Sequence, residues 1–433
     1  RTTGAGAHTL LARIIRMVQQ AQGSKAPVQR IADRIASVFV PTVIGLSALT
    51  FVLWLVIGGE AYFSHALLSA VSVLVIACPC ALGLATPTAL MVGIGRGAEN
   101  QILIKDAAAL EQMCRIDTMV LDKTGTLTEG RPSVTEWIDV VPPSDGLYDA
   151  VYSAEMKSEH PLASAVTAYL AGRGARRREV DSFESLTGRG IAFRCDGASY
   201  WIGSRALLET RDVRPSVELL ARIDRLEQEG AGTVFVGQDD RLLSVVVVSD
   251  PLKETTREAL EQLRRRHIRL VMLTGDNRRA AAALAGRLGI DDFRAEMMPD
   301  DKEQYVRRLQ AEGRRVAMTG DGINDSQALA RADVSIAMGR GTDVAMDVAM
   351  ITLMNSDLSL LPKAYALSRS TVRLIRENLF WAFVYNLIGI PIAAGALYPL
   401  CGLLLSPMLA GAAMAFSSVS VVANSLRLKW KKL

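Results

Sequence analysis

Three long stretches without a charged residue constrain this chain more than any other feature of its sequence. Residues 35–58, 61–95 and 378–426 contain no Asp, Glu, Lys or Arg, although 22% of all residues are charged. A helix needs about 20 apolar residues to cross a bilayer, and the turn-forming segment 395–399 divides the last stretch. The sequence therefore predicts four membrane-spanning helices, at 35–58, 61–95, 378–395 and 402–426.

Basic residues lie on only one side of these predicted helices. The short loops 59–64 and 396–402 contain none, whereas the opposite helix ends carry many. They are Arg30, Arg34, Arg96, Lys105, Arg369, Arg373, Arg376, Arg427, Lys429, Lys431 and Lys432. By the positive-inside rule the segment 96–377 is cytoplasmic, and we expect an integral protein of the plasma membrane. The net charge is only +4, without a basic stripe interleaved with aromatics, which argues against a nucleic-acid partner.

The cytoplasmic segment has the pattern of an α/β fold. Four short apolar runs are typical of buried parallel strands; they lie at 118–121, 269–273, 315–318 and 334–337. Three of these runs end in polar, glycine-rich turns: DKTGT at 122–126, TGDN at 274–277 and TGDGIND at 319–325. Ligands bind at the carboxyl ends of strands in such sheets. Residues 136–245 interrupt the series after its first strand and therefore look like an inserted domain.

The polar turns carry the groups that phosphoryl transfer requires. Asp122 directly follows a strand, where its carboxylate can attack a γ-phosphoryl group and form an acyl phosphate. Such a reaction needs positioning and charge neutralisation, and Mg²⁺ prefers oxygen ligands. The other turns and a nearby lysine supply these groups: Thr274, Gly275, Lys302 and Asp321, with Asp325 or Asn324 beside it. Each turn alone could be an ordinary helix cap, but together they predict a phosphoryl-transfer site.

These motifs resemble the signature of the P-type ATPases, which are built on a haloacid dehalogenase-like fold. The matching motifs are DKTGTLT at 122–128, TGD at 274–276 and GDGIND at 320–325. The resemblance implies that Mg-ATP phosphorylates Asp122. It implies a catalytic set of Asp122, Lys123, Thr124, Thr274, Gly275, Asp276, Lys302 and Asp325, and a Mg²⁺ site of Asp122, Thr124 and Asp321. The family usually has Ala-Pro where this chain has Ser326-Gln327, a departure that changes no catalytic atom.

One consequence follows from chemistry alone. Related phosphatases carry a general acid/base Asp two residues after the nucleophile, where this chain has Thr124. A threonine hydroxyl cannot activate water as a carboxylate does. We therefore expect an aspartyl phosphate on Asp122 to persist.

The predicted inserted domain contains two further motifs, SEHPLA at 158–163 and Gly188-Arg189-Gly190. Each is weak alone, since His-Pro and Gly-x-Gly are common in loops. Beside the other motifs they resemble the nucleotide-binding domain of heavy-metal-transporting P-type ATPases. That resemblance implies an ATP pocket formed by Glu155, His160, Gly188 and Gly190. The sequence has no P-loop, so we expect ATP to bind without a Walker motif.

Cys78-Pro79-Cys80 interrupts a predicted membrane helix and marks a candidate ion site. Pro79 breaks the helix, which would let both cysteines face one site, as in transporters with broken helices. Two small packing cysteines beside a kink are the plainer alternative. Thiolates favour Cu(I), and residues 378–426 offer no carboxylate that a divalent ion would favour. Further candidate ligands are Tyr385, Asn386, Met414 and Ser418; these pairs resemble the copper(I) branch of the family.

The expected fold class is a multi-domain membrane protein with helical spans, an α/β phosphorylation domain and an inserted α+β nucleotide-binding domain. The expected soluble parts are 1–34, the end of an actuator domain; 96–135 with 246–360, the phosphorylation domain; 136–245, the nucleotide-binding domain; and 427–433, a tail. No Thr-Gly-Glu occurs, so we expect upstream parts of the family's chain to be missing and residues 1–433 alone not to pump.

The leading hypothesis is an ATP-driven exporter of Cu(I) or Ag(I), using Mg²⁺, monomeric, surrounded by membrane lipid and supplied by a soluble copper chaperone. A Zn²⁺ or Cd²⁺ pump is the alternative within the family. Outside this class, the alternatives are a membrane-tethered phosphatase, against which Thr124 and the CPC helix argue, and a non-catalytic receptor or scaffold. The intact set of Asp122, Lys302 and Asp321 argues against the receptor.

Overall fold

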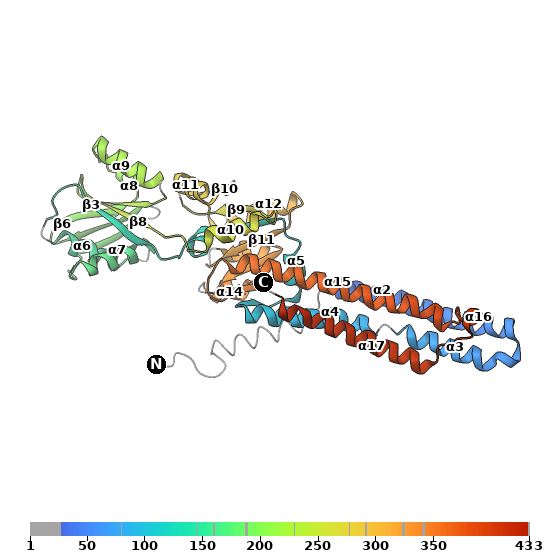
Figure 1. The fold of residues 1–433 in the computed structure, drawn as a ribbon. Helices are drawn as coiled ribbons and strands as arrows, with labels where there is room; N and C mark the ends of the chain where they lie inside the picture. The colour runs from blue at the N-terminus through green and yellow to red at the C-terminus, as the bar shows by residue number, and fades with distance from the viewer. Residues whose placement is uncertain are drawn as a thin grey trace.

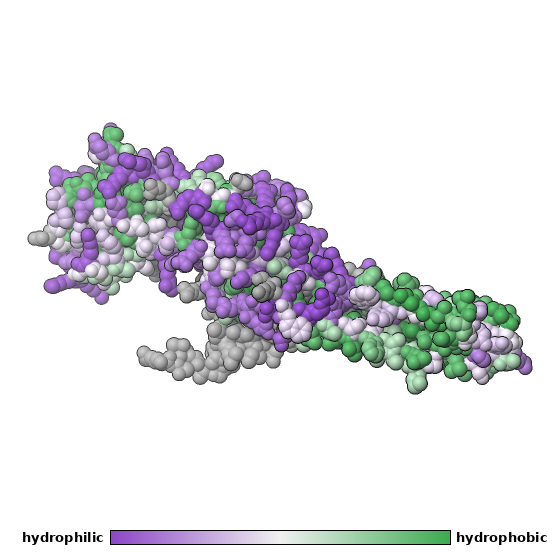
Figure 2. Space-filling view, viewed as in Figure 1, coloured by the Kyte–Doolittle hydropathy of each residue, from purple (hydrophilic) through white to green (hydrophobic). Residues whose placement is uncertain are grey.

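The computed structural model describes residues 27–78, 80–144, 146–158, 161–186, 189–228, 230–276, 278–290, 292–322, 325–339 and 343–431. These residues form three parts arranged in a row (Figure 1): a bundle of long helices at one end, a mostly parallel sheet in the middle and an antiparallel sheet at the other end. The surface changes character along this row, from an apolar bundle to strongly hydrophilic sheet parts (Figure 2).

The bundle is built from helices whose apolar side chains face outward as well as inward. Its elements are α2 (Pro27–Gly58), η2 (Glu60–Tyr62), α3 (Phe63–Ile76), α4 (Cys80–Glu99), α15 (Leu360–Ala393), α16 (Tyr398–Cys401), α17 (Pro407–Leu426) and η5 (Arg427–Trp430). Large apolar side chains such as Val56, Ile57 and Leu387 are exposed. Such a surface suits hydrocarbon rather than water.

Three helical stretches in the described part of the chain are long and apolar enough to cross a membrane: Arg34–Gly58, Glu60–Glu99 and Pro407–Trp430. The predicted span 378–395 is not among them. Its helix, α15, ends at Ala393, and Arg376 and Glu377 directly precede its apolar part. It nevertheless packs against α3, α4 and α17 within the bundle. Between α3 and α4 the helix is interrupted at the CPC motif, where α3 ends at Ile76.

The central sheet has seven strands in the described residues, in the order β1-β13-β12-β11-β2-β9-β10. They are β1 (Ile102–Ile104), β13 (Ile351–Leu353), β12 (Val334–Met338), β11 (Val316–Gly320), β2 (Thr118–Asp122), β9 (Arg269–Leu273) and β10 (Asp292–Arg294). All neighbours are parallel except β1 and β13. The four predicted strands are β2, β9, β11 and β12, and the prediction missed the three-residue strands near the sheet edges.

Helices cover both faces of this sheet because strand residues alternate between the faces. Met119 and Leu121 join one core, whereas Val120 joins the other. The first core is completed by α5 (Ala107–Met113), α10 (Thr256–Arg264), α11 (Arg278–Leu288) and the start of α15. The second is completed by α12 (Pro299–Ala311), α13 (Ser326–Arg331) and α14 (Asp343–Val348).

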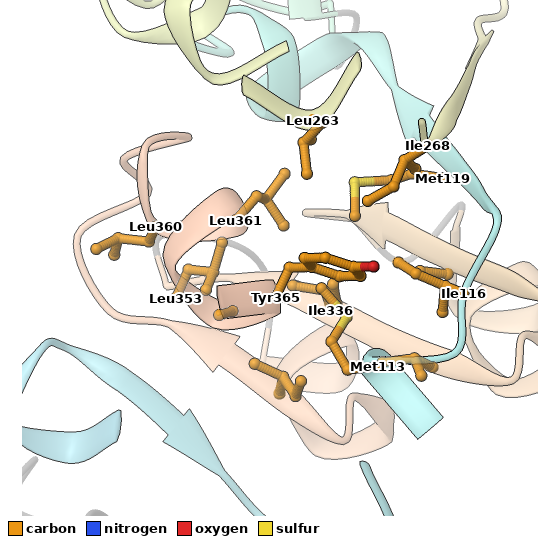
Figure 3. Close-up of a cluster of buried hydrophobic side chains, with 14 of the residues drawn as sticks. Met113, Ile116, Met119, Leu263, Ile268, Ile336, Leu353, Leu360, Leu361 and Tyr365 are labelled. Atoms are coloured by element: carbon orange, nitrogen blue, oxygen red, sulfur yellow. The ribbon is translucent and has the colours of Figure 1, made fainter. Parts of the chain in front are cut away.

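Helix α15 connects the sheet to the bundle without a break. Near its beginning, the Tyr365 ring lies among Met113, Ile336, Leu353 and Leu361 in the buried cluster of Figure 3. The same helix continues for 34 residues, or roughly 50 Å, into the bundle. One continuous helix therefore joins the core of the sheet to the bundle.

The third part is a six-stranded antiparallel sheet in the order β3-β8-β7-β6-β5-β4. Its strands are β3 (Ser133–Asp139), β4 (Ser182–Leu186), β5 (Gly190–Cys195), β6 (Ala198–Gly203), β7 (Gly232–Gln238) and β8 (Arg241–Ser249). One face packs on α6 (Leu147–Glu155) and α7 (Pro161–Gly172), and the other on α8 (Arg205–Thr210) and α9 (Val217–Gln228). The chain leaves the central sheet after β2 and returns to it at β9.

Candidate functional site

The three polar turns meet at one edge of the central sheet. Strands β11, β2 and β9 are parallel neighbours, so their carboxyl ends lie side by side. Asp122 closes the middle strand and is buried. The chain then turns sharply at Gly125, which has a φ of 69°, a conformation that glycine adopts without strain.

Lys302 holds the carboxylate of Asp122 in place. It projects from the first turn of α12, and its Nζ donates to Asp122 Oδ1 at 2.6 Å and to Asp325 Oδ1 at 2.8 Å. All three side chains are buried. Asp325, which the family resemblance implied, contacts Lys302 directly; Asn324, the other candidate, lies outside the described residues.

The carboxylates outnumber the single buried lysine, and their pKa values reflect this. Burial and the charge of Asp325 raise the pKa of Asp122 to about 7, although Lys302 opposes the shift. Burial, again with Asp325, raises the pKa of Asp321 to about 6. Burial alone would lower the pKa of Lys302, but the charges of Asp122 and Asp325 outweigh it and raise that pKa. The site therefore has excess negative charge, which a bound cation would relieve.

The geometry of the carboxylates fits Mg²⁺. Oxygen atoms of Asp122, Asp321 and Asp325 lie within 4.8 Å of one another, and oxygen is the ligand type this ion prefers. Gly125 makes room for this arrangement, because a Cβ there would lie 1.5 Å from Asp321 Oδ2. Thr124, the other predicted Mg²⁺ ligand, is exposed at the same turn.

The turn after β9 faces the same edge. Thr274 is buried, and its Oγ1 accepts from the backbone N–H of Asp276 at 3.1 Å. Asp276 Oδ2 in turn accepts from Lys123 Nζ at 2.5 Å, which joins the TGD turn to the DKTGT turn. Gly275 is exposed there. The fold thus brings all eight residues of the predicted catalytic set to one edge of the sheet.

A second candidate site lies in the antiparallel sheet part. A cavity of about 540 Å³ is lined by Glu155, Lys157, Phe183 and Gly190, together with residues of α7 and of strands β4 to β7. Burial raises the pKa of Glu155 to about 7. Lys157 and Phe183 were not predicted; Lys157 directly precedes the SEHPLA motif, whereas Phe183 lies in no motif. His160 and Gly188 lie outside the described residues.

At Gly190 the backbone has a φ of 145°, and a Cβ would lie 2.1 Å from the carbonyl oxygen of Ile202. Only glycine fits this wall of the cavity. The tight packing of β5 on β6 is thus a second reason for the glycine, beside the nucleotide contact that the sequence suggested.

The third candidate site is the interior of the bundle near Cys78. Met414 is buried with Ile76 and Ala77, which directly precede Cys78. Asn386 is also buried, and its Oδ1 has no hydrogen-bond partner in the described residues. Cys78 is disulfide-bonded, whereas metal ligation needs a free thiolate. Pro79 and the side chain of Cys80 lie outside the described residues.

The other predicted ligands are placed less deeply. Tyr385 is 40% exposed at the bundle surface. Ser418 is half-buried, and its hydroxyl donates to the carbonyl oxygen of Met414 at 3.3 Å. Its neighbour Ser417 is fully buried, with no partner for its hydroxyl in the described residues. Ser417 is therefore the better candidate ligand, which the spacing of four from Met414 did not reveal.

Comparison with known proteins agrees with these features. Residues 116–333 match the haloacid dehalogenase-like hydrolase family. The chain is 48% identical over 424 residues to a copper-exporting P-type ATPase of Legionella pneumophila, covering 98% of this chain and 58% of the relative. It is also 48% identical to a silver exporting P-type ATPase of Salmonella typhimurium, covering 100% of this chain and 52% of that protein. The chain thus spans little more than half the length of these relatives.

A solved structure extends the likeness to three dimensions. A zinc-transporting PIB-type ATPase in the E2.Pi state superimposes with a TM-score of 0.75 at 32% identity. The match covers 98% of this chain and 68% of that structure.

Proposed function

We propose that this chain, which belongs to the PIB-type branch of the P-type ATPases, uses ATP to phosphorylate Asp122 and thereby drives export of Cu(I) or Ag(I). The phosphorylation of Asp122 is supported above all by one observation, the buried pairing of Asp122 with Lys302 at the carboxyl end of β2. The carboxylates of Asp321 and Asp325 face the same point.

In the proposed reaction a carboxylate oxygen of Asp122 attacks the γ-phosphorus of ATP. The bond from that phosphorus to the β–γ bridging oxygen breaks, ADP leaves, and an acyl phosphate remains on Asp122. Lys302 stays beside the carboxylate, where its charge neutralises the transferred group. Mg²⁺ held by Asp122, Asp321 and the exposed Thr124 would supply further charge neutralisation at the phosphate oxygens. Thr274 and Gly275 would donate to those oxygens.

Stability of the acyl phosphate is part of the proposal. Thr124, two residues after the nucleophile, has no carboxylate with which to activate water. Asp276 cannot easily replace it, because Lys123 Nζ engages its carboxylate at 2.5 Å. The phosphorylated state therefore lasts long enough to be coupled to a movement of the bundle.

We assign ATP to the cavity at Glu155, with adenine in its apolar interior. Below pH 7 the carboxyl of Glu155 is largely neutral, so it can donate to adenine N1 and accept from the N6 amino group. Ionisation removes the donor. We expect adenosine, which has no titrating phosphate, to bind about fivefold more weakly at pH 8 than at pH 6. Isothermal titration at both pH values measures this difference.

Glu155→Gln is the matched variant, because its amide keeps one donor and one acceptor at every pH. Its adenosine affinity should not change between pH 6 and pH 8. An equal pH dependence in both proteins would remove Glu155 from the adenine contact.

The choice of ion rests on chemistry and on the relatives. Cys78 and Met414 offer soft sulfur ligands, which favour Cu(I) and Ag(I). Residues 378–426 contain no carboxylate, and a divalent ion would leave more uncompensated charge in the bilayer. Relatives at 48% identity export copper or silver, whereas the zinc transporter is 32% identical.

Ion-stimulated ATP hydrolysis by the intact protein tests this choice. We expect stimulation by Cu(I) and Ag(I) under reducing conditions, with little response to Zn²⁺ or Cd²⁺. Preferential stimulation by Zn²⁺ would establish the zinc/cadmium alternative instead. Hydrolysis that needs no ion would favour a membrane-tethered phosphatase.

The remaining assignments belong to the same proposal. The intact protein would work as a monomer in the plasma membrane, with both sheet parts in the cytoplasm, and would receive copper from a soluble chaperone. The central sheet, 96–135 with 246–360, would be the phosphorylation domain and 136–245 the nucleotide-binding domain. The basic helix ends and the apolar surface of the bundle support this orientation.

A further inference from the structure

We infer that Asn378 is a positioning residue for the ion site, because it fixes the axial register of α4, α15 and α17, the helices that carry or directly follow the proposed ligands. It lies on α15 in the part of the bundle nearer the sheets and is 1% exposed. The inference rests on the proposed ion transport but concerns a residue that touches no ion.

The side-chain amide of Asn378 contacts two other helices at once. Its Nδ2 donates to the carbonyl oxygen of Ala85 on α4 at 3.2 Å and to Ser425 Oγ on α17 at 2.8 Å. Its Oδ1 accepts from Asn424 Nδ2 at 2.9 Å. Ser425 Oγ also lies 3.2 Å from Thr88 Oγ1 on α4. We call this group of five residues the amide clamp.

Both N–H donors of the Asn378 side chain and its acceptor oxygen thus take part in cross-helix hydrogen bonds. In a bilayer a buried amide has no water as an alternative partner. Sliding any of the three helices by one residue would move its partner atoms by about 1.5 Å and break these bonds. A single buried Asn is known to set register between packed helices in this way.

The clamp stands about two helical turns from the candidate ligands Asn386 and Ser417. Counting away from the sheets, Asn386 is eight residues beyond Asn378, Ser417 eight residues before Ser425, and Cys78 seven residues before Ala85. Eight residues correspond to about 12 Å of helix. Because α17 runs opposite to α15 here, the two spacings of eight residues place Asn386 and Ser417 at a similar depth, whereas Cys78 lies two residues before the start of α4.

Two of these three side chains carry polar atoms that have no partner in the described residues, Asn386 Oδ1 and Ser417 Oγ. Such atoms are costly in a membrane unless they meet a ligand. A cavity of about 210 Å³ also connects the clamp residues Asn378 and Asn424 to Tyr385. The clamp is thus a hydrogen-bonded contact between three helices, two of which carry these unpartnered atoms, and we infer that it sets the relative heights of Asn386 and Ser417.

Replacing Asn378 with Leu in the intact protein tests this role. We expect the Cu(I) concentration for half-maximal phosphorylation from ATP to rise about tenfold, corresponding to roughly two interhelical hydrogen bonds. Maximal phosphorylation at saturating Cu(I) should stay within about twofold. Labelling from inorganic phosphate without copper should be unchanged, because that reaction needs Asp122 but no ion ligand.

Two further variants make the test specific. Ser425→Ala removes one clamp bond and should raise the half-maximal concentration less; combined with Asn378→Leu it should add little, since both act through one contact. Ser420→Ala is the matched control, because Ser420 lines the same cavity but bonds only within α17, to the carbonyl oxygen of Ser417 at 2.7 Å. It should behave like the unaltered protein.

The possible outcomes distinguish a positioning role of the amide clamp from a general effect on folding and from a failure of the proposed function. Equal losses in all labelling reactions with Asn378→Leu and with Ser425→Ala would show a folding role and overturn the inference. Strictly additive effects of the two substitutions would also overturn it. If the unaltered protein shows no copper-dependent phosphorylation, the proposed function fails first, before any variant is compared.

Discussion

Replacing Asp122 with Asn is expected to abolish acid-stable phosphate labelling of the intact protein by ATP. The substitution keeps the size of the side chain and its place at the end of β2, but the amide has no anionic oxygen to attack phosphorus. Lys302 would still be held by Asp325 at 2.8 Å. The loss should therefore reflect chemistry rather than disruption of the site.

The thermal stability of the Asp122→Asn variant distinguishes a loss of chemistry from a disruption of the site. Burial raises the folded-state pKa of Asp122 from its ordinary value of 3.8 to about 7, so folding disfavours the ionised form. This destabilisation begins above the unfolded-state pKa and is complete above the folded-state pKa. At pH 7.5 Asp122→Asn removes it, and the variant should unfold at the same or a higher temperature.

Asp300→Asn is the matched control for this experiment. It makes the same chemical change two residues from Lys302, in the first turn of α12, but at an exposed position. It should label normally. Acid-stable labelling that survives in Asp122→Asn would place the nucleophile elsewhere and remove the central proposal.

The sequence predicted the parts of the fold that combine burial with sufficient length. Strands β2, β9, β11 and β12 have five residues each and stand out as apolar runs between charged segments. Strands β1, β10 and β13 have three residues each, too few to show a periodicity. Their pairing depends on neighbours that are distant in the chain, such as Ile102 opposite Leu353.

The candidate site also has a part that the sequence predicts and a part that depends on tertiary contacts. Strand topology was enough to predict that Asp122, Thr274 and Asp321 would meet, because parallel strand ends share an edge. The turn itself left Asp325 and Asn324 as alternatives, and only the family resemblance favoured Asp325. The hydrogen bond from Lys302 on α12 to Asp325 is a tertiary contact that no local pattern predicts.

In the bundle, the sequence likewise did not predict which side chains of α17 face the interior. A spacing of four favoured Ser418 as the partner of Met414. The buried face of α17 instead comprises Ala410, Met414, Ser417, Val421 and Ser425, because neighbouring helices, rather than one spacing, decide which face is covered. The amide clamp was missed for a related reason, since no motif joins Asn378 to Ser425.

Replacing Cys78 with Ser is expected to reduce copper-stimulated phosphorylation of the intact protein to the level seen without copper. Serine keeps the shape of the side chain but exchanges a soft sulfur for a hard hydroxyl oxygen, which Cu(I) binds poorly. The assay requires a reductant, because Cys78 is disulfide-bonded in the structure and only the thiolate binds metal. Labelling from inorganic phosphate should persist, since Asp122 and Lys302 are unchanged.

Cys401→Ser is the control for nonspecific loss of a thiol. Cys401 is exposed on α16, and its Sγ donates only to the carbonyl oxygen of Leu397. This variant should respond to copper normally. Normal copper stimulation in Cys78→Ser would instead return Cys78 to a packing role beside the helix break.

X-ray absorption on the copper-loaded protein adds the direct test of ligand type. With Cys401→Ser as the starting protein, the first shell should contain sulfur, and Cys78→Ser should lower the sulfur count. A shell of nitrogen or oxygen alone would exclude the assignment. The two neighbouring serines test the geometry of the site. Ser417→Ala should weaken copper activation more than Ser418→Ala, because of these two serines only Ser417 has a buried hydroxyl without a partner in the described residues. Ser418 already donates to the backbone of α17.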